Sequence, residues 1–227
     1  MSFNIAIDGP AGAGKSTIAK QLAKDLGVVY VDTGAMYRAM AYYFITNGIG
    51  EKDIVKIIDA CKHVDVTITY ENGAQNVWLN GENVSGKIRT EEVGNMASAT
   101  SVYPVVRNKL VELQQQLAKT TDVIMDGRDI GTVVLPHADV KIYMTASSAI
   151  RAKRRFDELT AKGIECDLDD IEKDIIDRDY RDMNRETSPL KKADDAVELD
   201  TSNLDIDGVV AAIKEIVAKA QEENSCK

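Results

Sequence analysis

Eight consecutive residues near the start of this chain have the types and spacing of a phosphate-binding loop. The pattern G-x-x-x-x-G-K-[ST] is matched without a gap by Gly9, Pro10, Ala11, Gly12, Ala13, Gly14, Lys15 and Ser16. Glycines let a backbone approach a phosphate group without an intervening side chain. We therefore expect Lys15 to reach the β- and γ-phosphates of a nucleotide, and the Ser16 hydroxyl to join the shell of a Mg²⁺ ion.

The residues on either side of this loop predict the elements that would position it. Residues 3–8 form a short apolar run typical of a buried strand, and residues 15–26 carry apolar side chains at helical spacing. A helix that begins at the loop directs its free N–H groups and the positive end of its dipole at a bound phosphate. The alternative is a glycine-rich connection in which Lys15 is merely solvated, and the predicted strand and helix argue against it.

The composition excludes several other classes of function. The 227 residues carry a net charge of −9, which would repel a nucleic-acid backbone, so we expect no nucleic acid polymer as a partner. No apolar run approaches the length of a membrane span and no apolar signal segment begins the chain, so we expect a cytoplasmic protein without a membrane partner. Three widely spaced cysteines, Cys61, Cys166 and Cys226, suggest reduced thiols and no disulfide. The two histidines, His63 and His137, are too few and too isolated for a zinc site.

Strand and helix patterns alternate along most of the chain, which predicts an α/β fold with a parallel sheet covered on both faces. Further strands are expected at 28–31, 122–126, 140–144 and 196–200. Helices are expected at about 34–47, 51–62, 90–99, 103–119, 147–161 and 168–185, and an amphipathic helix at the C-terminus. The exception is an antiparallel hairpin of residues 64–70 and 76–79, in which Asn72-Gly73 is a turn signal.

Charged residues follow two of the predicted strands, at the edge where ligands bind in open α/β sheets. Arg38 lies one helical turn beyond the second strand and could hold an anion there, although an isolated helix arginine is more often solvated. A second group follows a central strand and consists of Asp126, Gly127, Arg128 and Asp129. Asp-Gly is also a common turn pair. A rigidly backed carboxylate nevertheless suits a Mg²⁺ site, and two acids beside an arginine favour a functional role.

Arginines gather on the two helices predicted late in the chain. One helix face is shared, at i, i+3, i+4 and i+7, by Arg178, Arg181, Asp182 and Arg185. The preceding helix carries a second such group, Arg151, Arg154 and Arg155. Salt bridges within each helix explain part of this clustering, but arginine also forms forked bonds to phosphate. We interpret the two faces as a clamp around phosphoryl groups, with residues 162–167 as the tip of a mobile lid.

These motifs, in their order along the chain, resemble the bacterial cytidylate kinase family over essentially the whole sequence. The most specific parts are residues 126–132 and the inserted hairpin, because the loop at 9–16 alone indicates only nucleotide binding. The resemblance implies the three-layer fold of P-loop nucleoside monophosphate kinases, with a five-stranded parallel sheet, a small antiparallel β insert and a helical lid. It divides this single kinase chain, residues 1–227, into a core of 1–33, 99–150 and 186–227, an NMP-binding region of about 34–98, and a lid of about 151–185.

The resemblance implies an enzyme, acting as a monomer, that transfers the γ-phosphoryl group of ATP to CMP or dCMP in pyrimidine nucleotide metabolism. The products would be ADP and CDP or dCDP. ATP would bind at residues 9–17, which end in Thr17, and at the lid residues Arg154 and Arg155. Mg²⁺ would be held by Ser16, with Asp126 behind it. Because the acceptor is already an anion, catalysis needs no general base and is mainly positioning and charge neutralisation.

Matching positions imply a role for each residue of the acceptor site. The ligands of the acceptor phosphate, which with Lys15 would be the catalytic residues, are Arg38, Arg128 and Arg185. The residues against the sugar are Arg178 and Asp182. The readers of cytosine are Ser98, Arg107 and Asp129. Asp129 can accept from the cytosine amino group, whereas uracil would present O4 to it, acceptor against acceptor. Thr33, also expected at the CMP site, stands where many relatives have serine and keeps the hydroxyl.

Two other functions fit parts of the same sequence. One is a kinase of this fold for UMP, AMP or a hydroxylated acid such as shikimate. A hydroxyl acceptor would favour a carboxylate near the γ-phosphate as a base, and Asp126 or Asp32 could serve. The inserted hairpin and the arginine set argue against it. A nucleotide switch without enzymatic activity would order its loops on binding, and would need partner surfaces instead of an acceptor pocket.

Overall fold

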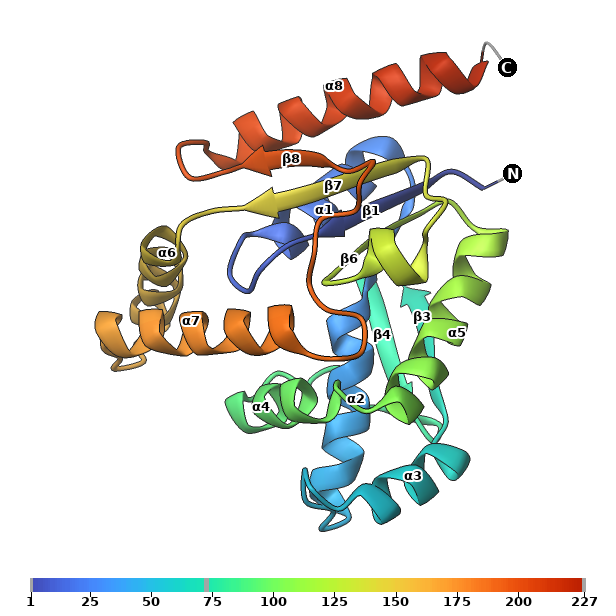
Figure 1. Cartoon of the computed structure of the whole chain (residues 1–227), viewed down its shortest axis with the longest axis vertical. Helices are drawn as coiled ribbons and strands as arrows, with labels where there is room; N and C mark the ends of the chain where they lie inside the picture. The colour runs from blue at the N-terminus through green and yellow to red at the C-terminus, as the bar shows by residue number, and fades with distance from the viewer. Residues whose placement is uncertain (1, 72–73, 226–227) are drawn as a thin grey trace.

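A parallel sheet lies at the centre of the fold, as the alternation of strands and helices predicted. The computed structural model describes residues 2–71 and 74–225, so the turn expected at Asn72 and Gly73 lies outside the described residues, as does Cys226. Within those ranges the five strands lie in the order β2 (Val29–Asp32), β6 (Val123–Gly127), β1 (Asn4–Asp8), β7 (Val140–Thr145) and β8 (Val197–Asp200). Because these strands all run the same way, their carboxyl ends share one edge (Figure 1).

Helices cover both faces of this sheet, so the fold has three layers (Figure 1). The covering helices are α1 (Lys15–Leu26) and α8 (Ile206–Ser225) on one face, and α2 (Thr33–Thr46) and α5 (Pro104–Thr120) on the other. Ile5 and Ile7 of β1 enter the first core and Ala6 enters the second. Because alternate residues enter different cores, the strand reads as one apolar run. Among the described residues, no helix has both the length and the apolar content needed to cross a bilayer.

The insert that follows α2 is a small antiparallel sheet with one strand more than the predicted hairpin. After α3 (Ile54–His63) come the strands β3 (Val66–Glu71), β4 (Ala74–Leu79) and β5 (Glu82–Asn83). The strand β5 is two residues long, too short to carry the period-two pattern from which strands are predicted. Val77 and Leu79 of β4 share the core of α2. The insert is therefore packed on the helix that follows β2.

Asp8, the last residue of β1, fixes the segment that leaves the neighbouring strand β6. Its buried carboxylate accepts hydrogen bonds from the backbone N–H groups of Ile130, at 2.8 Å, and Gly131, at 2.7 Å. These N–H groups begin a single π-helical turn, η1 (Ile130–Val134), which the sequence did not predict. Because the turn starts directly after Asp129, Asp8 also fixes the backbone at that candidate site residue.

Two helices joined by a short connection form the region predicted as a lid. α6 (Ser148–Ala161) and α7 (Leu168–Asn184) pack on each other beside the carboxyl end of β7, and α4 (Glu91–Thr100) packs on α2 (Figure 1). Asp167 caps α7, since its carboxylate accepts from the N–H groups of the second and third helical residues. The predicted lid tip, residues 162–167, is the segment between the two helices.

The buried carboxylate of Asp8 gives the fold a characteristic pH dependence. Burial raises the pKa of Asp8 from 3.8 to about 6, although the two N–H donors oppose this shift. The folded protein therefore binds the Asp8 proton more tightly than the unfolded chain does, so the contribution of Asp8 to stability falls as the pH rises between these two values. We expect the unfolding free energy of the wild type, minus that of Asp8→Asn, to decrease by roughly 2 kcal/mol across this range. Urea unfolding at a series of pH values measures this difference, and a difference independent of pH would contradict the prediction.

Candidate functional site

The glycine-rich loop connects β1 to α1 at the carboxyl edge of the sheet, as predicted. Gly9 has φ +150°, and a Cβ atom there would lie 2.0 Å from the carbonyl oxygen of Met144 on β7, so only glycine fits. Gly14 has φ +83° and stands immediately before the helix. Lys15 is buried, and its ammonium group donates to the carbonyl oxygen of Pro10 at 2.7 Å. The lysine is thus folded back along the loop and is not a solvated side chain.

Lys15 lies in a strongly charged environment. Burial lowers the pKa of Lys15 well below its ordinary value, and the nearby positive charge of Arg128 adds to this effect. The carboxylates of Asp126 and Asp8 oppose it. A negatively charged ligand beside the ammonium group would raise this pKa again, because an opposite charge favours the protonated form. The electrostatics of the loop therefore favour an anion.

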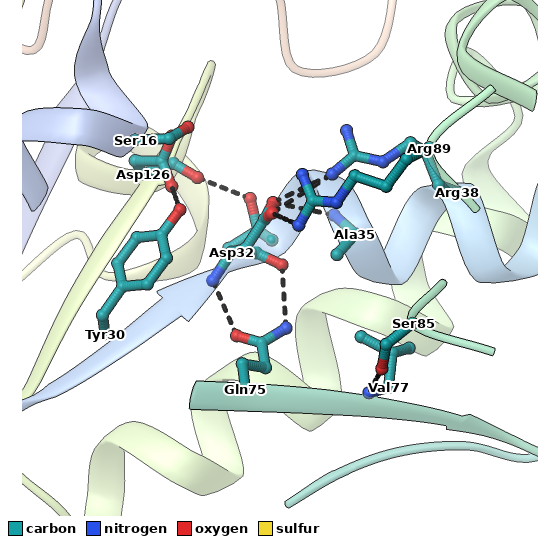
Figure 2. Close-up of polar contacts among 11 residues, drawn as sticks. Ser16, Tyr30, Asp32, Ala35, Arg38, Gln75, Val77, Ser85, Arg89 and Asp126 are labelled. Carbon is teal, nitrogen blue, oxygen red and sulfur yellow. Dashed lines mark hydrogen bonds and ion pairs between the residues drawn. The ribbon is translucent and has the colours of Figure 1, made fainter. Parts of the chain in front are cut away.

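Asp126 accepts hydrogen bonds from two hydroxyl groups on different elements (Figure 2). Ser16 Oγ donates to Asp126 Oδ2 at 2.8 Å, and the Tyr30 hydroxyl donates to Oδ1 at 2.8 Å. Thr33 Oγ1 donates to the backbone oxygen of Asp126 at 2.7 Å. Burial raises the pKa of the Asp126 carboxyl, and the negative charge of Asp32 raises it further. Ser16 and Asp126 together offer oxygen ligands of the kind that Mg²⁺ prefers, and the residues present therefore fit this ion.

Asp32 joins four segments at the carboxyl end of β2 (Figure 2). Its carboxylate caps α2 by accepting from the N–H of Ala35 at 2.9 Å. It also pairs with Arg38 at 3.1 Å and with the more exposed Arg89 at 2.8 Å. The side-chain amide of Gln75 on β4 accepts from the Asp32 N–H at 2.8 Å and donates to its carbonyl oxygen at 3.3 Å. The insert is therefore attached to the sheet edge beside Arg38.

Arg107 and Asp129, both predicted to read the base, form a buried ion pair. Arg107 Nη2 contacts Asp129 Oδ2, and Arg185 Nη2 lies 3.6 Å from the other oxygen, Oδ1. The Arg107 guanidinium also lies over the ring of Tyr37, 5.6 Å from its centre. Ser98 is half-buried on α4, and its carbonyl oxygen accepts from the hydroxyl of Ser101 at 2.9 Å. The carbonyl oxygen of Ser101 in turn accepts from Arg107 Nη1 at 3.4 Å, which connects the three predicted base readers.

Some of the charged residues of α7 contact this site, and others are exposed to solvent. Arg128 Nε donates to Asp182 Oδ2 at 2.9 Å. Burial, with the positive charge of Arg128, lowers the pKa of Arg178 to about 10. Arg181 is exposed, whereas the neighbouring Asp182 is buried. Arg185 follows the last helical residue, and its Nε reaches the carbonyl oxygen of Ser188 at 2.7 Å.

Several buried arginine atoms of this site have no hydrogen-bond partner among the described residues. They are Arg38 Nε, Arg107 Nε, Arg178 Nε and Arg185 Nη2. Buried donors are nearly always paired in proteins, so a group of unpaired guanidinium atoms is unusual. The arginines gathered here therefore have donors free for an anionic ligand with several oxygen atoms.

The three arginines of α6 have separate surroundings. Arg154 donates to the carbonyl oxygen of Thr201 at 2.7 Å, at the end of β8. Arg155 forms an exposed ion pair with Glu158 at 2.9 Å. Arg151 is buried and contacts the phosphate loop, together with Asp179 of α7.

Sequence reasoning missed the roles of four residues at this site, Tyr30, Gln75, Arg151 and Asp179. Tyr30, Gln75, Arg151 and Asp179 contact Asp126, Asp32, Ala11 and Ala11, which lie between 43 and 168 positions away along the chain. The only local signal was the position of Arg151 on the arginine-rich face of α6.

Comparison with known proteins gives a consistent result. A family profile described as cytidylate kinase matches residues 5–219. The chain is 54% identical over 220 residues to a protein of Lactobacillus johnsonii named cytidylate kinase, covering 97% of this chain and 96% of that protein. It is 50% identical over 222 residues to a protein of Streptococcus suis with the same name, covering 97% of each. A solved gluconokinase from Sinorhizobium meliloti 1021 has a TM-score of 0.50 at 10% identity, covering 99% of this chain and 97% of that one, which is a likeness of fold alone.

Removing one partner of the buried Arg107–Asp129 pair should destabilise the folded protein, because the other charge is left buried without it. In Arg107→Met, the Asp129 carboxylate keeps only the more distant Arg185, so we expect a loss of about 3 kcal/mol of unfolding free energy. Arg155→Met, which breaks an exposed pair, should cost less than about 0.5 kcal/mol. Urea unfolding of both variants tests this difference. Equal losses of unfolding free energy in the two variants would show that the buried pair contributes no more to stability than the exposed pair.

Proposed function

The chain belongs to the cytidylate kinase family, and on that premise we propose that it transfers the γ-phosphoryl group of ATP to CMP or dCMP, giving ADP and CDP or dCDP. One observation carries the proposal beyond the family name. Arg128 and Asp129 are adjacent in the chain but have different partners, since Arg128 pairs with Asp182 and Asp129 pairs with Arg107. The cation assigned to the acceptor phosphate, Arg128, is therefore the chain neighbour of a buried hydrogen-bond donor and acceptor, Arg107 and Asp129, that suit a nucleobase.

The phosphate loop supplies the donor side of the reaction. We assign the binding of the ATP phosphates to residues 9–17 and the neutralisation of charge on the transferred group to Lys15. Ser16 and Asp126 would hold Mg²⁺, which when bound neutralises charge on the β- and γ-phosphates. The buried position of Lys15 on this loop supports the assignment, because its ammonium group lies beside the loop backbone, 2.7 Å from the carbonyl oxygen of Pro10.

The arginines supply the acceptor side. We assign the acceptor phosphate to Arg38, Arg128 and Arg185, and the sugar to Arg178 and Asp182. The unpaired donors of Arg38, Arg178 and Arg185 support this assignment. Since the acceptor phosphate is already an anionic nucleophile, these groups act by holding it in line with the γ-phosphate and by neutralising charge.

The base would be read by Ser98, Arg107 and Asp129, with Thr33 at the edge of the CMP site. Asp129 accepts from the exocyclic amino group of cytosine, and Arg107 donates to its ring acceptors. The pair of Arg107 and Asp129 already present supports this role, because its charges are fixed before the base arrives. Uracil would face Asp129 with O4, and the repulsion between two acceptors would disfavour UMP.

The remaining regions have roles that follow from their positions. We propose that residues 1–33, 99–150 and 186–227 form the core, that about 34–98 bind the monophosphate, and that about 151–185 close over ATP with Arg154 and Arg155. Closure would exclude water, which competes with CMP for the phosphoryl group. We further propose a cytoplasmic monomer.

The decisive experiment measures ADP release from ATP and Mg²⁺ with CMP, dCMP, UMP, AMP and shikimate in parallel. We expect release with CMP and dCMP in the wild type. In Lys15→Ala the kcat with CMP should fall by at least about 10²-fold, because a positioned cation at the transferred group is lost. Absence of CMP-dependent release in the wild type, or near-normal turnover by Lys15→Ala, would refute the proposed function.

Asp129 tests the choice of base. In Asp129→Asn the side chain can donate to O4 of uracil as well as accept, so we expect the ratio of kcat/KM for CMP over UMP to fall by about tenfold or more. Steady-state kinetics with both monophosphates gives this ratio. If both kcat/KM values fall by the same factor, then Asp129 supports the site without reading the base. Thermal unfolding serves as the control for intact folding.

A further inference from the structure

A buried ion pair ties the phosphate loop to the two lid helices. Asp179 of α7 accepts from the N–H of Ala11 at 3.2 Å with Oδ1, and its Oδ2 lies 2.6 Å from Arg151 Nη1. Arg151 of α6 donates from this same Nη1 to the carbonyl oxygen of Ala11 at 2.8 Å. Its Nε donates to the carbonyl oxygen of Ala146 at 2.9 Å. Both polar backbone groups of one loop residue are therefore held by charged side chains from distant helices.

These contacts are shielded from water and hold a loop that is rich in glycine. The side chains of Arg151 and Asp179 are only 7% and 11% exposed, so water does not compete with their hydrogen bonds. Gly9, Gly12 and Gly14 all have positive φ, and such glycines add conformational freedom that other contacts must restrict. A Cβ atom at Gly12 would lie 3.3 Å from Arg151 Cβ, so the loop also packs closely on α6. The shape of the loop thus depends on the lid helices.

The same helix also carries residues assigned to the acceptor. Asp179 directly follows Arg178 and lies one turn before Asp182 on α7. Asp182 pairs with Arg128, which follows β6. One helix therefore contacts the phosphate loop on the donor side and the arginine cluster on the acceptor side. A shift of α7 that improves one set of contacts necessarily changes the other.

We propose that Arg151 and Asp179 are positioning residues that couple the two substrate sites. They hold the phosphate loop in its ATP-binding shape while α6 and α7 are in place, so that a nucleoside monophosphate bound against Arg178 and Asp182 tightens the binding of ATP. This inference rests on the function proposed above and adds the means by which one substrate affects the other. The role differs from that of Arg154 and Arg155, because the Arg151 guanidinium is already bound to Asp179 and two backbone carbonyl groups.

The test measures the dissociation constant of a non-hydrolysable ATP analogue with Mg²⁺, in the absence and presence of saturating CMP. In the wild type we expect CMP to tighten the binding of the analogue by about fivefold or more. In Asp179→Asn the amide cannot satisfy both the Ala11 N–H and the Arg151 guanidinium, so the analogue should bind about tenfold more weakly and the effect of CMP should disappear. The dissociation constant of CMP alone should change by less than about twofold, since Asp179 is not among the residues assigned to CMP. Asp177→Asn, the same change at an exposed position of α7, should behave as the wild type.

Hydrogen exchange of the wild type gives a second measurement that needs no variant. Saturating CMP alone should slow amide exchange in peptides covering residues 9–16, and absence of slowing overturns the proposal. An unchanged effect of CMP in folded Asp179→Asn, or no effect of CMP on analogue binding in the wild type, also overturns it. If CMP does not bind the wild type at all, the proposed function fails and this inference fails with it. If CMP binds and is phosphorylated without tightening the analogue, only this inference fails.

Discussion

The candidate site depends on the balance between buried cations and buried carboxylates. An unpaired charge inside a protein is very costly, because water no longer solvates it. The chain carries a net charge of −9, yet it gathers its arginines at one edge of the sheet. Four of the buried or half-buried arginines there have an acidic partner, in the pairs Arg38–Asp32, Arg107–Asp129, Arg128–Asp182 and Arg151–Asp179. These carboxylates make a cationic site compatible with folding before any phosphate is bound.

The parallel sheet explains where the central carboxylates stand. Asp8 ends β1, Asp32 ends β2 and Asp126 is next to last in β6, and Asp32 and Asp126 are direct partners in register. Three adjacent strands therefore bring three acids to one edge, where the negative charge of Asp32 raises the pKa of Asp126. The structure offsets this repulsion with donors. Asp8 accepts two N–H groups, Asp32 accepts from arginines and an N–H, and Asp126 accepts two hydroxyl groups.

Local sequence patterns predicted most of the fold and most of the site, and failed where distance along the chain mattered. The phosphate loop could be predicted because its strand, glycines, lysine and helix are contiguous. The turn η1 could not, because it is stabilised by Asp8, 122 positions away. Helical spacing puts Arg181 and Asp182 on one face of α7, but it does not tell which of them is buried, and the structure buries Asp182 and exposes Arg181. Arg151 and Asp179 contact Ala11 across 140 and 168 positions, and no spacing rule reaches that far.

The two substrate sides are attached to the same sheet edge by different carboxylates. Asp32 holds the start of α2, Arg38, Arg89 and, through its backbone, Gln75 of the insert, so it organises the side assigned to the monophosphate. Asp179 holds Ala11 and Arg151, so it joins the lid helices to the side assigned to ATP. Phosphoryl transfer to an anionic acceptor requires the two sides to meet in line, and misplacement by about 1 Å costs about 10²-fold in rate. A single acid on each side is bonded to the backbone of a loop or of a helix start. Each acid therefore fixes one half of the site relative to the sheet edge.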